Sequence, residues 1–242
     1  MNWRDPATYD YTQTLNAAQW AWEFLRRNSE YQSDYHWFKK TWDTLEQRYG
    51  KPPARDYSRW QQDPLAWRIS DERLSSQECT MDGERLQIEC WMGQKWGFYK
   101  FPLDPSHCAP VSADQLAWRE RPTDAVMMTH ENSDTYLTGD TRIALGFDLS
   151  LPLKQQLEDS RKMLAILQRQ LQKHTPERIC KVATQREYWM TCLRILDGLA
   201  IESYTMVNEH FIGEGIDIAL LSKNALQLCK GGYLDLLVIP DK

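Results

Sequence analysis

The sequence predicts an α+β protein built from three parts. Apolar residues recur at spacings of three and four, as on one face of a helix, in residues 1–69 and again in residues 152–242. The periodicity changes in residues 70–151, where Asp82-Gly83 is typical of a tight hairpin turn. We therefore expect an N-terminal helical hairpin, a small, mainly antiparallel β domain and a C-terminal helical bundle.

The N-terminal part is expected to contain two helices. The second pattern runs from Tyr35 to Tyr49, and Gly50 followed by Pro52-Pro53 ends it. Many of the spaced residues are aromatic, which fits either a stacking platform for single-stranded nucleic acid or a core. The core interpretation is favoured, because large rings dominate the burial energy of a small domain. Five cations are assigned to an exposed basic edge of this part: Arg4, Arg26, Arg27, Lys39 and Lys40.

In the middle part, Glu78–Met81 and Leu86–Trp91 are predicted to pair as a hairpin. Further strands are expected at Trp96–Phe101, Ala125–His130, Thr135–Leu137 and Ile143–Phe147. This part contains no Gly-rich phosphate loop and no metal-ligand spacing. A structural spacer is therefore favoured over a ligand-sensing domain.

A long amphipathic helix is expected to begin at Pro152. Its apolar side carries Leu153, Leu157, Leu164, Leu167 and Leu171. Two roles stay open from the sequence: the helix binds a partner or a second copy, or it packs along the C-terminal bundle.

Three shorter helical patterns follow between Gln185 and Lys230. Ser203 and Asp217 stand where their side chains can cap the second and third helices. The apolar stripe of the third helix consists of Ile218, Leu221, Ala225 and Leu228. Three helices with such short connections have the layout of a helix-turn-helix DNA reader, although any compact three-helix bundle has the same spacing.

Two pairs of motifs resemble a known family. Ile195–Ala200 and the closing Gly231–Leu237 are similar to a helix-turn-helix variant found in regulators of proteobacterial integrative and conjugative elements. Trp3–Pro6 and Trp20–Asn28 resemble the transcriptional-regulator-like domain that precedes this module in the fused activators. The resemblance implies a sequence-specific DNA-binding regulator of transcription, an activator of excision or transfer genes of a mobile genetic element.

The DNA-reading interpretation assigns roles to particular side chains. Lysine can bond guanine and asparagine or glutamine can bond adenine in the major groove, while arginine and lysine contact phosphates. The residues expected to contact DNA are Ser222, Lys223, Asn224, Gln227, Lys230, Arg186, Arg194, Arg26 and Arg27. Double-stranded DNA is thus the expected partner, with RNA polymerase or a family antiactivator protein as further partners.

The chain departs from the family pattern in its charge. Family members carry several arginines along the third helix and usually a basic residue after Gly-Gly-Tyr, whereas this chain has Lys223 and Lys230 in the helix and Leu234 at the later position. This keeps an alternative open, a protein-interaction module like the family's antiactivators, which bind an activator instead of DNA. The presence of both parts of the fused activators favours the activator.

Composition narrows the class of protein further. The net charge of −5 argues against a protein that coats nucleic acid, because such binding depends on cations displacing counterions from phosphates. No run of eighteen apolar residues occurs, so we expect no membrane contact and a cytoplasmic location. The sequence leaves the oligomeric state open.

Neither catalysis nor a cofactor is expected. No Gly-x-Ser-x-Gly elbow or cysteine-nucleophile signature occurs, so the protein is predicted not to be an enzyme. The six cysteines form no Cys-x-x-Cys pair, and neither a metal site nor a redox pair is indicated. We expect no catalytic residues, no metal ligands and no cofactors.

Overall fold

The computed structural model describes most of the chain. The described residues are 2–69, 81–82, 85–99, 101–108, 111–112, 115–119, 143–174 and 181–239. They fall into two compact units, of which one joins Met1–Arg121 to Val182–Lys242 and the other is Pro122–Lys181. This grouping differs from the division at residues 69/70 and 151/152 that the sequence suggested, because both ends of the chain lie in one unit.

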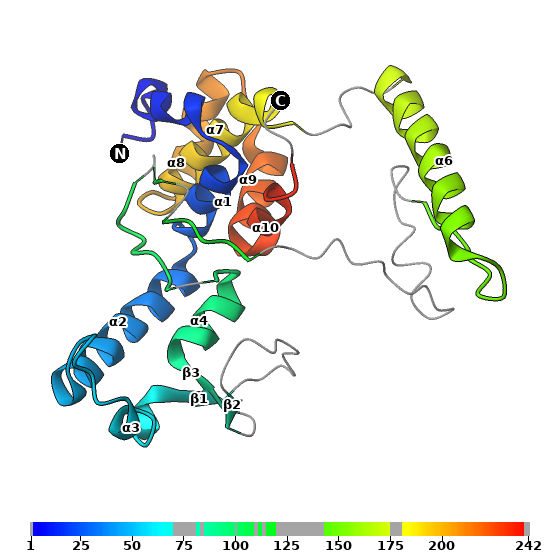
Figure 1. The fold of residues 1–242 in the computed structure, drawn as a ribbon. Coiled ribbons are helices and arrows are strands. Elements are labelled where there is room, and N and C mark those ends of the chain that lie inside the picture. The colour runs from blue at the N-terminus through cyan, green and yellow to red at the C-terminus, as the bar shows by residue number, and fades with distance from the viewer. Residues whose placement is uncertain are drawn as a thin grey trace. The chain divides into compact units, whose positions relative to one another are not determined.

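The larger unit begins with a succession of helices (Figure 1). The 3-10 helix η1 (Pro6–Thr14) leads to α1 (Ala17–Leu25), α2 (Ser29–Tyr49) and the short α3 (Tyr57–Trp60). Local sequence explains these bounds. Asparagine side chains cap the starts of α1 and α2, and Gly50 ends α2 at a φ of 83°, which glycine adopts without steric cost.

α1 and α2 pack mainly against different partners. α1 contacts α7 (Val182–Leu199) and α10 (Tyr233–Leu236) of the C-terminal part, whereas α2 contacts α3 and α4 (Ile88–Trp96). The prediction that the two helices pack as a hairpin is therefore wrong. α1 is buried almost all round, from Trp20 through Leu25, and a helix that is apolar on every side needs partners from several elements.

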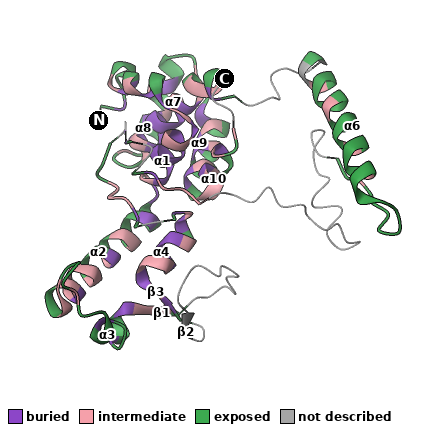
Figure 2. Cartoon of the chain, in the orientation of Figure 1, coloured by how far each residue is buried: buried purple, intermediate pink, exposed green. Residues whose placement is uncertain are grey.

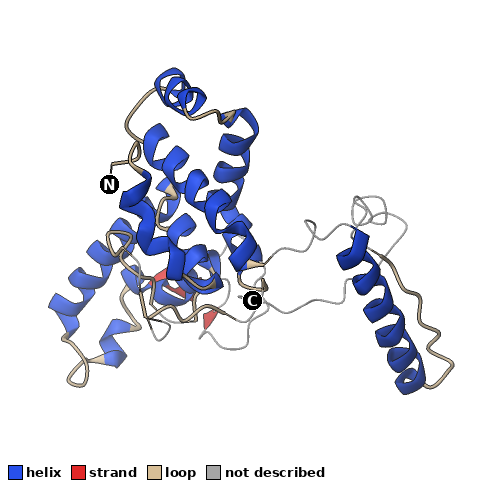
Figure 3. Ribbon diagram, turned by 90° about the horizontal axis from the view of Figure 1, so that it is seen from above, coloured by secondary structure: helices blue, strands red, loops and turns tan. Residues whose placement is uncertain are grey.

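A small antiparallel sheet follows. Its strands β1 (Trp67–Ile69), β2 (Met81–Asp82) and β3 (Arg85–Gln87) lie in the order β1-β3-β2. Asp82 is the partner of Arg85 in the register, which confirms the hairpin predicted around Asp82-Gly83. The coarse α+β prediction holds, although helix dominates the described residues (Figure 3).

The strand predicted over Leu86–Trp91 ends early. β3 stops at Gln87 and the chain continues as helix α4 (Ile88–Trp96), so the strand prediction is wrong beyond that residue. Alternation of apolar and polar residues from Leu86 persists only to Cys90. From there Trp91, Met92 and Trp96 are buried at helical spacing, and this longer pattern determines the structure.

The remaining strand predictions have different outcomes. Instead of a strand over Trp96–Phe101, only Phe98 makes a single antiparallel bridge, with Trp118. Ile143–Phe147 has no regular secondary structure, so that prediction is wrong. Ala125–His130 and Thr135–Leu137 lie outside the described residues.

The C-terminal part of the larger unit is helical, as predicted. It contains α7 (Val182–Leu199), α8 (Tyr204–Gly213) and α9 (Ile218–Gln227), followed by the π-helical turn η4 (Leu228–Gly232) and α10 (Tyr233–Leu236). The predicted caps are confirmed, since Ser203 accepts a hydrogen bond from the backbone N–H of Met206 and Asp217 from that of Ala219.

Two hydrophobic clusters connect the two ends of the chain (Figure 2). The Trp20 ring of α1 lies 5.3 Å from the Trp189 ring of α7. Trp3 packs into the bundle formed by α7, α8 and α9, where it stacks on Phe211 at 5.9 Å and lies close against Gly198. Most large rings of the N-terminal part are thus core residues, as predicted, and they bury surface of the C-terminal helices.

The second unit contains the predicted amphipathic helix. α6 runs from Leu153 to His174, which confirms a helix that begins directly after Pro152. Almost all of its described side chains are exposed (Figure 2).

The glycine that ends α4 has a backbone conformation that can be tested by substitution. Gly97 has a φ of 83°, and a Cβ there would lie 2.7 Å from a terminal methyl of Leu234 in α10. We expect Gly97→Ala to lower the free energy of unfolding by roughly 1–2 kcal/mol, mainly through backbone strain. Gly213→Ala is the control, since Gly213 has open space and no positive φ. Equal urea-denaturation midpoints for both variants would contradict this account.

Candidate nucleic-acid interface

α9 presents a mixed surface. Ile218 and Ala225 are buried against the bundle, whereas Lys223 and Gln227 are exposed. Lys230, in the turn that follows, is also exposed. These three residues are spaced by four and then three positions, so they follow one side of the helix and its extension. They are the predicted DNA-contacting residues that the structure leaves most accessible.

The other two predicted residues of α9 support the fold. The Asn224 side-chain amide donates a hydrogen bond to the Tyr188 hydroxyl of α7 at 3.0 Å. Ser222 is buried and its hydroxyl donates to the Ala219 carbonyl, so its expected position on the outer face is wrong. Asn224 is half-buried. In this conformation its amide positions α9 on α7.

Arg194 is not on the surface. The residue is 2% exposed, and its guanidinium donates to the Trp3 carbonyl and to both carboxylate oxygens of Glu214. The expectation that Arg194 contacts phosphate is therefore wrong for this conformation, because its donors hold the N-terminal segment against the bundle. Arg186 is half-buried on the first turns of α7.

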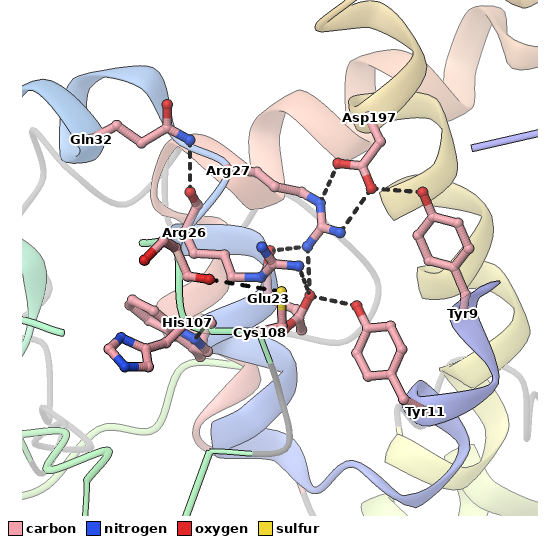
Figure 4. A network of polar contacts seen from close by, with 11 residues as sticks. Tyr9, Tyr11, Glu23, Arg26, Arg27, Gln32, His107, Cys108 and Asp197 are labelled. Atoms are coloured by element: carbon pink, nitrogen blue, oxygen red, sulfur yellow. Dashed lines mark hydrogen bonds and ion pairs between the residues drawn. The ribbon is translucent and has the colours of Figure 1, made fainter. Parts of the chain in front are cut away.

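Arg26 and Arg27 belong to an internal network of charges (Figure 4). The Arg27 guanidinium makes two parallel hydrogen bonds to Asp197 of α7, at 2.7 and 2.8 Å, and a third to Glu23 at 2.6 Å. Arg26 pairs with the same Glu23 oxygen at 2.8 Å. The two arginine side chains are only 11% and 8% exposed, so the expected exposed basic edge is wrong at these positions.

Two tyrosines complete the network. Tyr9 donates its hydroxyl hydrogen bond to Asp197 at 2.6 Å, and Tyr11 donates to Glu23 at 2.7 Å. Each carboxylate thus receives an arginine and a phenol. A buried carboxylate needs such partners, since its desolvation is otherwise costly.

The pKa values reflect this arrangement. Burial alone would raise the pKa of Glu23, but Arg27 and Arg26 outweigh it and lower that pKa to about 2. The Asp197 pKa is also lowered, because hydrogen bonding to Arg27 outweighs burial. Burial, and then the Glu23 charge, raises the pKa of Tyr11 to about 12. Both carboxylates are therefore ionised, and both tyrosines protonated, at neutral pH.

A hollow of about 190 Å³ lies beside this network and brings two predicted residues together. It is lined by Arg27, Asn28, Ser29, Leu196, Leu199, Ala200, Leu226, Cys229 and Lys230. The Asn28 amide donates to the Cys229 carbonyl at 2.9 Å, which fixes the turn after α9 to the start of α2. Lys230 therefore lies on a turn that is anchored to the N-terminal part.

Residues 182–239 are acidic as a whole, with four arginines and lysines against seven aspartates and glutamates. Two of those four cations, Arg194 and Arg186, are buried or half-buried. Large apolar side chains are instead exposed on α8 and α9, namely Met206, Ile212, Leu220 and Leu226. These exposed apolar side chains are a feature that the sequence pattern did not indicate.

Two features are absent from the part of the chain that the structure describes. No described helix has both the length and the apolar character needed to span a bilayer. Within the same residues, no three histidine, cysteine or carboxylate side chains gather as a metal site would require.

Comparison with known proteins identifies the N-terminal part. A family model described as a proteobacterial transcriptional regulator-like domain matches residues 2–61, which contain η1, α1, α2 and α3. No curated protein and no solved structure matches the chain. The match supports a regulatory role for the protein.

The charge network gives a pH prediction. The pKa of Glu23 is lowered to about 2 from an ordinary value of 4.5, so its contribution to stability is complete above about pH 4.5 and is lost as the pH falls toward 2. We expect Glu23→Gln to be less stable than the parent by on the order of 3 kcal/mol at neutral pH, with the gap narrowing through this window.

Urea unfolding followed by tryptophan fluorescence at several pH values would measure the gap. The exposed pair of Lys39 and Asp43 gives a control, since Asp43→Asn should change stability by less than about 1 kcal/mol at every pH. A gap between parent and Glu23→Gln that stays constant from pH 7 to pH 2 would contradict the assignment.

Proposed function

We propose that the protein is a sequence-specific DNA-binding regulator of transcription that inserts α9 into the major groove. The observation that carries this proposal is the exposure of Lys223, Gln227 and Lys230 along one side of a helix whose opposite side is buried. The regulator-like domain in residues 2–61 supports it. Lys223 and Gln227 are the candidates for base contacts, and Lys230 and Arg186 for phosphate contacts.

The three buried or enclosed arginines have a structural role in this proposal instead of contacting phosphate. Arg26, Arg27 and Arg194 are engaged with carboxylates inside the larger unit, so they place α7 and the N-terminal segment rather than bind phosphate. In residues 182–239 the other lysines and arginines are Arg186, Lys223 and Lys230, so the nonspecific affinity of this part for DNA is expected to be low. Specific contacts of α9 must then supply most of the binding energy. The proposed targets are excision or transfer genes of a mobile element, and the proposed further partner is RNA polymerase.

Lys223 provides the direct test. If its ammonium contacts a base, Lys223→Ala should weaken binding to the cognate site by about 1–3 kcal/mol, and Gln227→Ala should have a similar effect. Gel-shift titration with DNA from the gene's own upstream region, alongside a shuffled sequence of the same composition, would measure both. Lys51→Ala is the matched control. It removes the same charge from a largely exposed lysine that is far from Lys223 in the sequence.

The base-reading role predicts a loss confined to the cognate site. An equal loss on cognate and shuffled DNA would reduce Lys223 to a phosphate contact, and the salt dependence would then fall by about one unit of log–log slope. If Lys223→Ala bound the cognate site as tightly as Lys51→Ala does, Lys223 would make no contact with DNA and the proposed role of α9 would be wrong.

A second candidate function has its own observation. Leu220 is 67% exposed on α9 next to Lys223, and Leu226 is also exposed. Exposed apolar groups that cluster on one surface are typical of protein-protein contacts, and a net acidic module is better suited to a protein than to DNA. In this alternative the α8 and α9 surface binds a related regulator, as an antiactivator does.

Paired substitutions separate the two candidates. A DNA-reading α9 should lose reporter regulation in Lys223→Ala and retain most of it in Leu220→Ser, because the hydroxyl variant keeps the charge and the fold. A protein-binding surface should show the reverse. We expect the first pattern, with circular dichroism and melting temperature confirming that both variants are folded.

A further inference from the structure

α6 carries a heptad repeat of leucines. Leu157, Leu164 and Leu171 are seven residues apart, and Leu153 and Leu167 lie at the intervening positions. In heptad notation the first set occupies a and the second set occupies d, with Ser160 and the final residue His174 at the other d positions. The spacing averages 3.5 residues per turn, which is the period of helices that wind around one another and not that of a helix lying on a globular core.

The leucines of this seam are exposed in the structure. Leu157 is 57% exposed, and Leu153, Leu164 and Leu167 are exposed as well. Figure 2 shows exposed residues along most of the helix. Burying such side chains contributes about 1.5–3 kcal/mol each, so a row of them favours association with an apolar partner.

The charges of α6 are arranged off the seam. Lys162 pairs with Glu158 and Asp159 at 3.6 and 3.7 Å, and these residues occupy heptad positions f, b and c on the outer side. The helix therefore keeps its acidic residues, and the lysine they pair with, away from a/d contacts. Its length of 22 residues corresponds to about 33 Å, which accommodates three heptads.

The residues that border the seam fit a second copy of the same helix. In a parallel pair, each e residue faces a g residue of the partner helix. Arg161 at e then faces Gln156 at g, and Gln168 at e faces Met163 at g, so no like charges meet. An antiparallel pair would instead place the edge that carries Lys154 and Arg161 against the same edge of its partner.

We propose that α6 is a self-association element that forms a parallel two-stranded coiled coil with a second copy of this chain. The polar Ser160 at a d position makes the seam weaker than one of unbroken leucine, and it favours the register in which the two serines face each other. The dissociation constant of the dimer is expected to lie in the micromolar range for a coil of three heptads.

Self-association would affect DNA binding, but the proposed DNA contacts do not require it. Two copies present two α9 helices, and thus two sets of Lys223, Gln227 and Lys230, which compensates for the few exposed cations on α9 and the turn after it in a single copy. A two-fold symmetric dimer reads two half-sites. The coiled-coil proposal itself concerns only α6 and is tested without DNA.

Sedimentation equilibrium of the full chain in reducing buffer tests the proposal. We expect a concentration-dependent dimer from low micromolar to about 100 μM, and at least tenfold weaker association when Leu157→Lys and Leu164→Lys are combined. Ile166→Lys is the matched control. Ile166 is 54% exposed on the same helix but lies at position c, away from the seam, so this variant should dimerise like the parent.

The orientation is tested by cross-linking. Leu157→Cys lies near one end of α6, so two copies meet across a parallel seam and should form a disulfide-linked dimer on mild oxidation faster than Ile166→Cys does. Both variants contain the same native cysteines. The difference between their rates of disulfide formation therefore shows which introduced cysteine lies at the seam. This measurement also applies if the double lysine variant fails to fold.

Three results would overturn the proposal. The parent could stay monomeric up to about 100 μM, as expected if α6 packs within its own chain or takes a different partner. The double lysine variant could dimerise like Ile166→Lys while fully folded. Equal cross-linking of Leu157→Cys and Ile166→Cys would contradict the parallel arrangement.

Discussion

The guanidinium of Arg27 lies between two carboxylates that come from opposite ends of the chain. Glu23 is one turn away on α1, whereas Asp197 is near the end of α7, 170 residues later. Removing one member of such an enclosed group typically costs 3–5 kcal/mol, because it leaves a charge without its partner. Together with Trp3 in the C-terminal bundle, these ion pairs explain why the first and last parts of the chain form one unit.

This architecture has a consequence for function. The arginines that would give the helical bundle a basic surface pair with carboxylates inside the larger unit. α9 and the turn after it expose one lysine each, Lys223 and Lys230, beside exposed leucines of α9. The regulator-like N-terminal domain therefore does more than accompany the bundle, because its residues complete the bundle's core and neutralise its buried acid. In the proposed function, binding depends on the specific contacts of α9, and the proposed pairing of copies through α6 would strengthen them.

Local patterns predicted the local structure well. The caps at Ser203 and Asp217, the hairpin at Asp82 and the start of α6 all depend on residues within a few positions of one another. Two strand predictions, over Leu86–Trp91 and Ile143–Phe147, are wrong locally, whereas the errors at the arginines concern long-range partners. Nothing in the spacing of Arg27 or Arg194 distinguishes a surface cation from one that meets a carboxylate far away in the sequence. One signal was available for Glu23, since a carboxylate inside the apolar run Trp20–Leu25 needs a cation to be tolerated there.

A double-mutant cycle between Arg27 and Asp197 tests the central claim most directly. The free energy of unfolding would be measured by urea titration for the parent, Arg27→Met, Asp197→Asn and the double variant. If the ion pair joins the two ends of the chain, the coupling energy should be on the order of 2 kcal/mol or more, with one cooperative transition in the parent. Additive effects within about 0.5 kcal/mol would contradict the account.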